Sequence, residues 1–191
     1  MIGKVYSAAV TGIYAVPVEV QADVTPGIPY FELTGNLAGT TKEAKERVRI
    51  AIKNSKFQIN PSKITINMIP ANIRKEGTAY DLAVAVAVLT AVGVIAAKKV
   101  SGALFIGELG LDGGICNVSS ILPMTLCARD NGFTICYVPM GNIGEASLVT
   151  GIRVIGISSL RECVDYINNG CNCRAHVCLL YTSPSPRDTE R

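Results

Sequence analysis

The sequence predicts one domain of the mixed α/β class, and three patterns in it support this prediction. Polar and apolar residues alternate over residues 14–24, as in a strand that buries one face. Apolar residues recur at helical spacing over residues 41–55, which indicates an amphipathic helix. Residues 79–95 are apolar on nearly every side, which is typical of a helix covered all round. Strands and helices mixed along one chain of this length favour a single α/β domain.

The composition allows a large buried core and says little about a partner. The chain has 191 residues, of which 49% are hydrophobic and 17% charged. Its formal net charge of +3 permits a nucleic acid as partner, but nucleic-acid-binding domains usually concentrate more basic charge. The start of the chain lacks the apolar region of a signal peptide, and the most apolar window, residues 82–97, is short for a membrane span. We therefore expect a cytoplasmic protein with no membrane partner.

The first half of the chain is expected to form three strands, a helix and a fourth strand. Thr40 and Glu43 form a capping-box pattern at the start of the helix. The four strands are predicted at residues 3–10, 14–24, 29–34 and 63–69, and the helix at residues 41–55.

The second half is expected to start with the buried helix at residues 79–95, for which Thr78 and Asp81 form a cap pattern. A hairpin follows, with Asp112-Gly113 as its tight turn. Ser158 is predicted to cap the last helix. The hairpin strands are predicted at 103–111 and 114–118, further strands at 134–138 and 153–157, and helices at 120–130, 142–149 and 159–168.

Basic residues recur every three or four positions along the first predicted helix, which places them on one face. This face has two interpretations. It could contact a phosphate backbone or an acidic partner, or it could be an ordinary solvated helix face whose field Glu43 and Glu46 weaken. The basic residues are Lys42, Lys45, Arg49, Lys53 and Lys56.

Other candidate sites have simpler structural interpretations. The segment Gly35–Lys42 lies between a strand and a helix, as a phosphate cradle does, but its spacing does not match a P-loop. Glu108 and Asp112 could act as acid and base, or as a strand residue and a turn residue. Residues 1–169 contain no histidine, which excludes a Ser-His-Asp triad there and leaves a Ser-Lys dyad possible in principle.

Cysteines fall into two groups. Those within the predicted domain are expected to be small buried hydrophobes, namely Cys116, Cys127, Cys136 and Cys163. The others cluster with the only histidine in the tail, as Cys171, Cys173, His176 and Cys178. Their spacing lacks paired zinc knuckles, so we expect no metal site. The tail, residues 170–191, loses all periodicity and resembles a translated sequencing-adapter read-through; we expect it to be disordered and the domain to span residues 1–169.

Several blocks of the sequence occur together in a fixed order. They are KVYSAAVTGI, KERVRIAIKNSKF, ITINMIPANIRKEGTAYDLAVAVAVL, FIGELGLDGGI, and ILPMTLCARDNGF followed by VP. Taken together, they resemble the N-terminal domain of magnesium-chelatase-like AAA+ ATPases of the ComM/YifB type. The resemblance covers about residues 1–169, and the number and order of the blocks make it specific.

This resemblance implies a fold like that of the Lon protease proteolytic domain, which is related to the βαβ fold of ribosomal-protein domain 2. In the family, an AAA+ motor with a P-loop follows this domain. ATP and magnesium would belong to that motor, so no cofactor is expected in this chain. ComM-type proteins look like hexameric DNA helicases that promote branch migration in natural transformation. The resemblance thus implies a homo-oligomeric parent, with DNA as a possible partner, and a chain that stops before the motor.

The resemblance also implies that the domain is not an enzyme. Lon-type proteases carry a catalytic serine where this chain has Ala79 and a catalytic lysine where it has Leu122. The chain departs from its own family in two loops, Gly35–Ala38 and Ile69–Asn72, where relatives usually read GLPD and APAD. We expect a non-catalytic domain that serves ring assembly or contacts DNA or a partner. Two alternatives stay open: a Lon-like serine peptidase using Ser119 or Ser120, and a free-standing nucleic-acid-binding module using the basic face.

Overall fold

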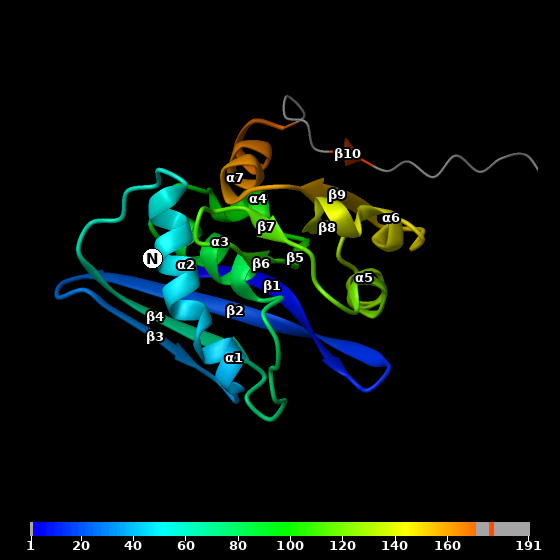
Figure 1. Ribbon diagram of the computed structural model, residues 1–191, viewed down its shortest axis with the longest axis horizontal. Helices are drawn as coiled ribbons and strands as arrows, with labels where there is room; N and C mark the ends of the chain where they lie inside the picture. Colours follow the sequence, from blue (N-terminus) through cyan, green and yellow to red (C-terminus); the bar gives the residue numbers. More distant parts are fainter. Residues whose placement is uncertain (1, 171–175, 178–191) are drawn as a thin grey trace, which may run out of the picture.

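A mixed eight-stranded β-sheet with helices against both faces forms the framework of the molecule (Figure 1). The computed structural model describes residues 2–170 together with residues 176–177. The strand order is β10-β9-β8-β5-β1-β2-β4-β3. Strands β1, β2 and β4 pair antiparallel, whereas β1, β5, β8 and β9 pair parallel along the other half of the sheet. The predicted mixed α/β class is therefore confirmed.

The strands lie close to where the alternating pattern predicts them in the first half of the chain. The sheet contains β1 (Ile2–Thr11), β2 (Tyr14–Pro26), β3 (Tyr30–Thr34), β4 (Ser62–Ile69), β5 (Ala103–Phe105), β8 (Ile135–Pro139), β9 (Arg153–Ile157) and β10 (His176–Val177). A separate two-stranded sheet contains β6 (Glu108–Leu109) and β7 (Ile115–Cys116).

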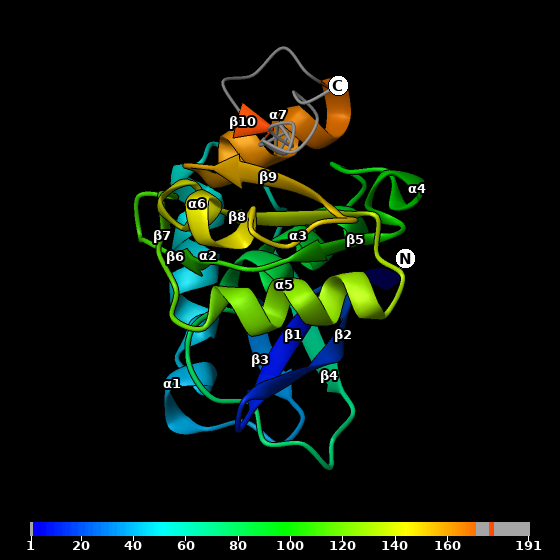
Figure 2. The same ribbon diagram turned by 90° about the vertical axis from the view of Figure 1, so that its right-hand side faces the viewer.

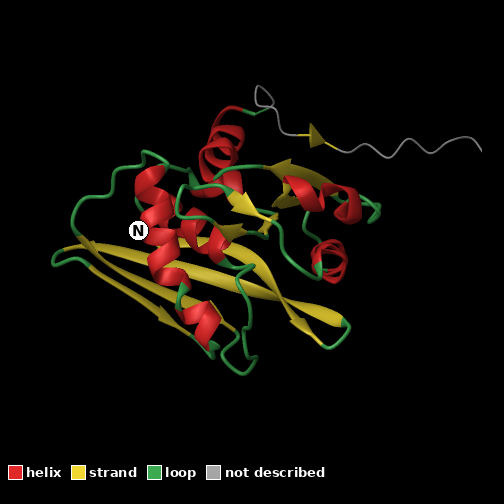
Figure 3. Cartoon of the chain, viewed as in Figure 1, coloured by secondary structure: helices red, strands yellow, loops and turns green. Residues whose placement is uncertain are grey.

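The helices are mostly short, and in two places one helix follows another with at most one residue between them (Figure 3). They are α1 (Gly39–Lys42), α2 (Ala44–Asn54), α3 (Asp81–Ala91), α4 (Ala97–Val100), α5 (Ile121–Asp130), the 3-10 helix η1 (Met140–Asn142), α6 (Ile143–Ala146) and α7 (Leu160–Asn169).

Helix α3 forms the centre of the larger core, as its all-apolar sequence predicts. Every one of its residues is buried, because β1 and β2 cover one side and α2 and α7 others. The backbone of α3 lies so close to β1 that a Cβ on Gly3 would sit 2.0 Å from the Ala87 carbonyl oxygen. Glycine at this position therefore allows the helix to pack directly against the strand.

A second, smaller core lies on the opposite face of the sheet, under α5 and α6 (Figure 2). Ala8 of β1 and Leu104 of β5 contribute to it, while their neighbours Ala9 and Phe105 point into the larger core. This alternation follows from the two-residue period of a strand. Because both faces of β5 are covered, its three residues are all buried.

The helix predicted over residues 41–55 is divided at Glu43, and the predicted capping box is wrong. The Thr40 side chain makes no cap to α1, whose N-cap residue is Ala38. The neighbouring Thr41 is buried instead, and its hydroxyl donates to the carbonyl oxygens of Lys75 and Gly77, both at 3.0 Å. Thr41 thus ties α1 to a loop far away in the sequence, and periodicity alone gives no sign of such a tie.

The buried helix starts at Asp81, and neither of its predicted cap residues acts as a cap. No side chain caps α3 at its N-cap residue, Tyr80. The Thr78 hydroxyl donates to the Glu108 carboxylate, and the Asp81 carboxylate binds Arg47. Both side chains therefore serve tertiary contacts, which satisfy them as well as a helix terminus would.

The predicted hairpin is also shorter than expected. Residues 103–105 belong to the main sheet, and only Glu108–Leu109 pair with Ile115–Cys116. Asp112 does form the turn, since its carboxylate accepts the Gly114 amide at 2.9 Å. Cys116 is exposed and contradicts the prediction for that cysteine, whereas Cys127, Cys136 and Cys163 are buried as predicted. Cys171, Cys173, His176 and Cys178, for which no metal site is expected, and the rest of the tail, which is predicted to be disordered, lie outside the residues whose side chains the structure describes.

Candidate functional site

The basic residues singled out in the sequence form one exposed strip along α1 and α2. Lys42 ends α1, three members lie on α2, and Lys56 follows α2 with a left-handed φ of 63°. All of them are exposed, while Ala44, Val48, Ala51 and Ile52 on the other side of α2 are buried. We call Lys42, Lys45, Arg49, Lys53 and Lys56 the basic strip.

Positive charge is concentrated in this part of the chain. Residues 39–56 contain six basic and two acidic side chains, a net charge of +4, whereas the whole chain carries only +3. The rest of the chain is therefore slightly acidic. Within the strip, only Arg49 is paired, with Glu46 at 2.9 Å. Over the described residues, no carboxylate lies within 4.0 Å of the four lysine amino groups of the strip.

A buried ion pair fixes the orientation of α2. Arg47 donates from Nε to Asp81 Oδ2 at 2.8 Å and from Nη2 to Asp81 Oδ1 at 3.2 Å. The Asp81 carboxylate is fully buried and also accepts the Leu109 amide at 3.3 Å. Burial raises the pKa of Asp81 to about 6, and the hydrogen bonds from Arg47 act against this rise. The Asp81 carboxylate in turn raises the pKa of Arg47.

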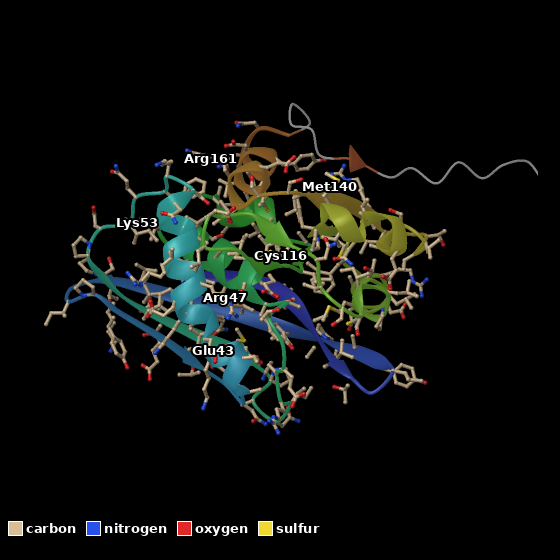
Figure 4. All side chains as sticks on the ribbon, in the orientation of Figure 1. Glu43, Arg47, Lys53, Cys116, Met140 and Arg161 are labelled. Atoms are coloured by element: carbon tan, nitrogen blue, oxygen red, sulfur yellow. The ribbon has the colours of Figure 1, made fainter. Side chains whose placement is uncertain are left out.

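Arg47 is the functional residue that sequence reasoning missed. It belongs to the same run of basic residues as the strip, but it points the other way, toward the start of α3 (Figure 4). Its 34-residue separation from Asp81 has no periodic signature. The available signal was an aspartate at the start of an all-apolar helix, because such a buried carboxylate needs a cationic partner.

The resemblance marks Ala79 and Leu122 as degenerate protease positions, and the structure describes the surroundings of both. Ala79 precedes α3 by two residues and is 6% exposed. Its carbonyl oxygen accepts the Gly107 amide at 2.9 Å, so the loop is pinned to the residue before β6. Leu122 is partly exposed in the first turn of α5. A methyl group and an isobutyl group can neither attack a carbonyl nor transfer a proton.

The two serines considered as a displaced nucleophile lie just before Leu122 in the sequence, and neither has a hydrogen-bonded base within residues 2–170. Ser119 and Ser120 are exposed just before α5, and Ser120 has a left-handed φ of 61°. Among the described residues, neither hydroxyl makes a hydrogen bond. Nucleophilic catalysis by serine requires a base within hydrogen-bond reach. The geometry therefore offers no support for either serine.

The loop Gly35–Lys42 does not fit a phosphate group. Two of its amides are already used, since the Ala38 amide donates to Lys75 O at 2.9 Å and the Lys42 amide to Ala38 O at 3.0 Å. Helix α1 has only four residues, too short to offer a strong terminal dipole. The residues present therefore do not fit ATP, and we derive no chemistry through it.

The two loops that the resemblance marks as departures, Gly35–Ala38 and Ile69–Asn72, both contact Lys75. The Lys75 amide donates to Asn36 O at 2.8 Å. Its ammonium group is buried and donates to the carbonyl oxygens of Met68, at 3.3 Å, and Pro70. Burial lowers the pKa of Lys75. Lys75 therefore links Gly35–Ala38 to Ile69–Asn72 through hydrogen bonds to both loops.

The remaining candidate groups carry no reactive arrangement. Asp112 is a turn residue, and Glu108 holds the Thr78 hydroxyl. Burial raises the pKa of the Cys127 thiol to about 11 and that of Cys136 to about 12, which keeps both protonated and unreactive. In the part of the chain that the structure describes, no cluster of His, Cys, Asp or Glu side chains could hold a metal ion. None of the described helices combines the length and apolarity needed to cross a membrane.

Comparison with known proteins assigns the family. A family model described as subunit ChlI of Mg-chelatase matches residues 20–142, and the chain belongs to this family. The chain is 33% identical over 164 residues to competence protein ComM of Haemophilus influenzae, covering 86% of this chain and 32% of that protein. It is 36% identical over 147 residues to YifB of Escherichia coli, covering 77% and 29%. The resemblance to the ComM/YifB type is therefore confirmed.

A more distant relative is the DNA repair protein RadA of Listeria monocytogenes. It is 27% identical over 171 residues, covering 84% of this chain and 34% of that protein. The chain thus spans about a third of the length of these curated relatives.

Proposed function

We propose that this chain is a non-catalytic domain of a ComM-like AAA+ ATPase and that its basic strip contacts DNA. The concentration of positive charge on α1 and α2 is the single observation that carries the proposal. The four exposed lysines of the strip have no acidic partner within salt-bridge distance among the described residues, which leaves their charges available to phosphates. The ion pair of Arg47 with Asp81 holds α2 rigidly, so the strip is presented in a fixed orientation.

The name of the relative RadA, a DNA repair protein, is consistent with this assignment. In the intact ATPase, ATP and magnesium would bind the motor, and the domain would take part in a homo-oligomeric ring. Branch migration during natural transformation would then be an activity of the whole protein. The contact between this domain and DNA would raise the affinity of the whole protein for DNA, and the domain itself would catalyse no reaction.

A salt titration tests the DNA contact. The full 191-residue chain is titrated against a fluorescent duplex, and anisotropy is followed at increasing salt. Contact of four or five basic residues of the strip with phosphates predicts a slope of log K against log salt of about −4. The double variant Lys45→Glu/Lys53→Glu is expected to weaken binding at least about tenfold and to flatten this slope.

The control variant Lys63→Glu/Lys98→Glu makes the same change in net charge at exposed lysines outside the strip. It is expected to change affinity much less. Equal losses in both double variants would mean that net charge, not the strip, governs binding, and the proposal would then fail.

The non-catalytic assignment is tested with an active-site serine probe. Because Ala79 and Leu122 replace the catalytic pair, wild-type protein is expected to remain unlabelled. Labelling that disappears in Ser119→Ala or Ser120→Ala would support the peptidase alternative instead.

A further inference from the structure

An arginine stacked on an aromatic ring lies at the end of the basic strip. Arg161 on α7 places its guanidinium carbon 4.6 Å from the centre of the Phe57 ring. Phe57 directly follows Lys56, the last residue of the strip, and its amide donates to Ile52 O at the end of α2. Figure 4 shows Arg161 and Lys53 at the same end of α2, although they come from different helices.

The guanidinium of Arg161 is held by the ring rather than by an acid. Over residues 2–170, no carboxylate lies within 4.0 Å of it. The neighbouring Glu162 carboxylate is occupied, since it accepts the Ser158 amide at 2.7 Å. Arg161 itself is exposed, while Phe57 is half-buried against the larger core. The guanidinium therefore lies over the ring without an acidic partner and remains exposed, where a ligand can reach it.

A planar cation fixed on an aromatic ring is suited to a base rather than to a phosphate alone. Bases stack on arginine guanidinium planes, and such stacking needs a base that is not already stacked in a duplex. The lysines of the strip supply the backbone contacts that a strand leading to this position requires.

We propose that the Arg161–Phe57 pair is a stacking position for an unpaired base, so that the strip prefers single-stranded DNA to a duplex. This inference rests on the proposed DNA contact of the strip. It adds two residues from α7 and from the segment after α2, neither of which periodicity connects to the strip.

The decisive variant is Arg161→Lys, which keeps the positive charge and removes the planar group. Affinity of the full chain is measured by anisotropy for a single-stranded oligonucleotide and for a duplex of the same length. Loss of one stacked base is expected to weaken the affinity for the single-stranded oligonucleotide about tenfold. Duplex affinity is expected to change less than about twofold, because the charge remains.

An oligonucleotide with abasic sites provides an independent readout. Wild-type protein is expected to bind it more weakly than the intact strand, by a factor similar to that caused by Arg161→Lys. The variant is expected to bind both oligonucleotides equally, since removing the base and removing the guanidinium eliminate the same contact. Thermal unfolding of the variant checks that the domain is intact.

The outcomes separate this inference from the proposal beneath it. Equal weakening of single strand and duplex by Arg161→Lys would overturn the stacking position. So would an unchanged single-strand affinity in a protein whose DNA binding still depends on Lys45 and Lys53. Absence of any DNA binding by the wild-type chain would overturn the DNA contact itself, and the stacking position with it.

Discussion

Arg47 and Asp81 form a two-point ion pair between the outer helix α2 and the first residue of the buried helix α3. The two nitrogen–oxygen distances are 2.8 and 3.2 Å, and the Asp81 carboxylate is completely shielded from solvent. The pair therefore joins the exposed basic strip to the centre of the core. It adds to the packing of Val48, Ala51 and Ile52, which also hold α2 on the core.

Removing the cation of this pair is expected to destabilise the protein strongly. Arg47→Met keeps most of the side-chain volume but leaves a buried carboxylate without its partner, which costs about 3–5 kcal/mol. Urea unfolding at pH 7 measures the difference. Arg49→Met is the matched control, because its pair with Glu46 is exposed and contributes less than about 1 kcal/mol. Similar losses in the two variants would contradict a special role of Arg47.

The same site predicts a pH dependence. The pKa of Asp81 is about 6 in the folded protein and near the ordinary aspartate value of 3.8 when the protein is unfolded. The folded state therefore binds the proton more tightly. This stabilisation is fully present below pH 4 and is lost as pH rises through about 6.

Asp81→Asn removes this titration while keeping the side-chain shape. The stability of wild type relative to the variant is expected to fall between pH 4 and pH 7, by at most about 3 kcal/mol. Urea unfolding of both proteins over this range measures the change. A relative stability that rises with pH would show that Arg47, not burial, governs the pKa of Asp81.

Close packing of α3 on β1 makes Gly3 sensitive to the smallest side chain. A Cβ there would lie 2.0 Å from Ala87 O and 2.7 Å from Ala91 N, both backbone atoms that cannot move separately. Gly3→Ala is therefore expected to cost about 3 kcal/mol or more in the free energy of unfolding. Gly39→Ala in α1 is the control, since nothing lies within 4 Å of its Cβ position. Thermal unfolding of both variants compares them, and equal melting temperatures would refute the close contact.

The sequence reveals those features of the fold that depend on local periodicity. Strand β2 and α3 are visible in the pattern of side chains, because β2 alternates polar and apolar residues and α3 is apolar on nearly every side. Features that depend on long-range partners are not visible. Thr41 and Arg47 look like ordinary helix residues, yet each binds a segment more than thirty positions away. The strip itself was predictable from spacing, whereas its stacking neighbour Arg161 comes from the last helix.

The sequence also predicts helix boundaries only approximately. The start of α7 is an example that can be tested. The sequence contains two adjacent serines before this helix, and Ser158 was the predicted cap. The structure shows that Ser159 is the cap, because its Oγ accepts the Glu162 amide at 3.1 Å. Glu162 reaches back to the Ser158 amide at 2.7 Å, so Ser158 contributes its backbone and not its hydroxyl.

Replacing the two serines in turn distinguishes these roles. Ser159→Ala is expected to cost about 1 kcal/mol, since one amide at the start of α7 loses its acceptor. Ser158→Ala keeps the backbone amide that Glu162 binds, so a change within about 0.5 kcal/mol is expected. Urea unfolding of both variants measures the difference. A larger cost for Ser158→Ala would place the start of α7 one residue earlier than the hydrogen bonds indicate.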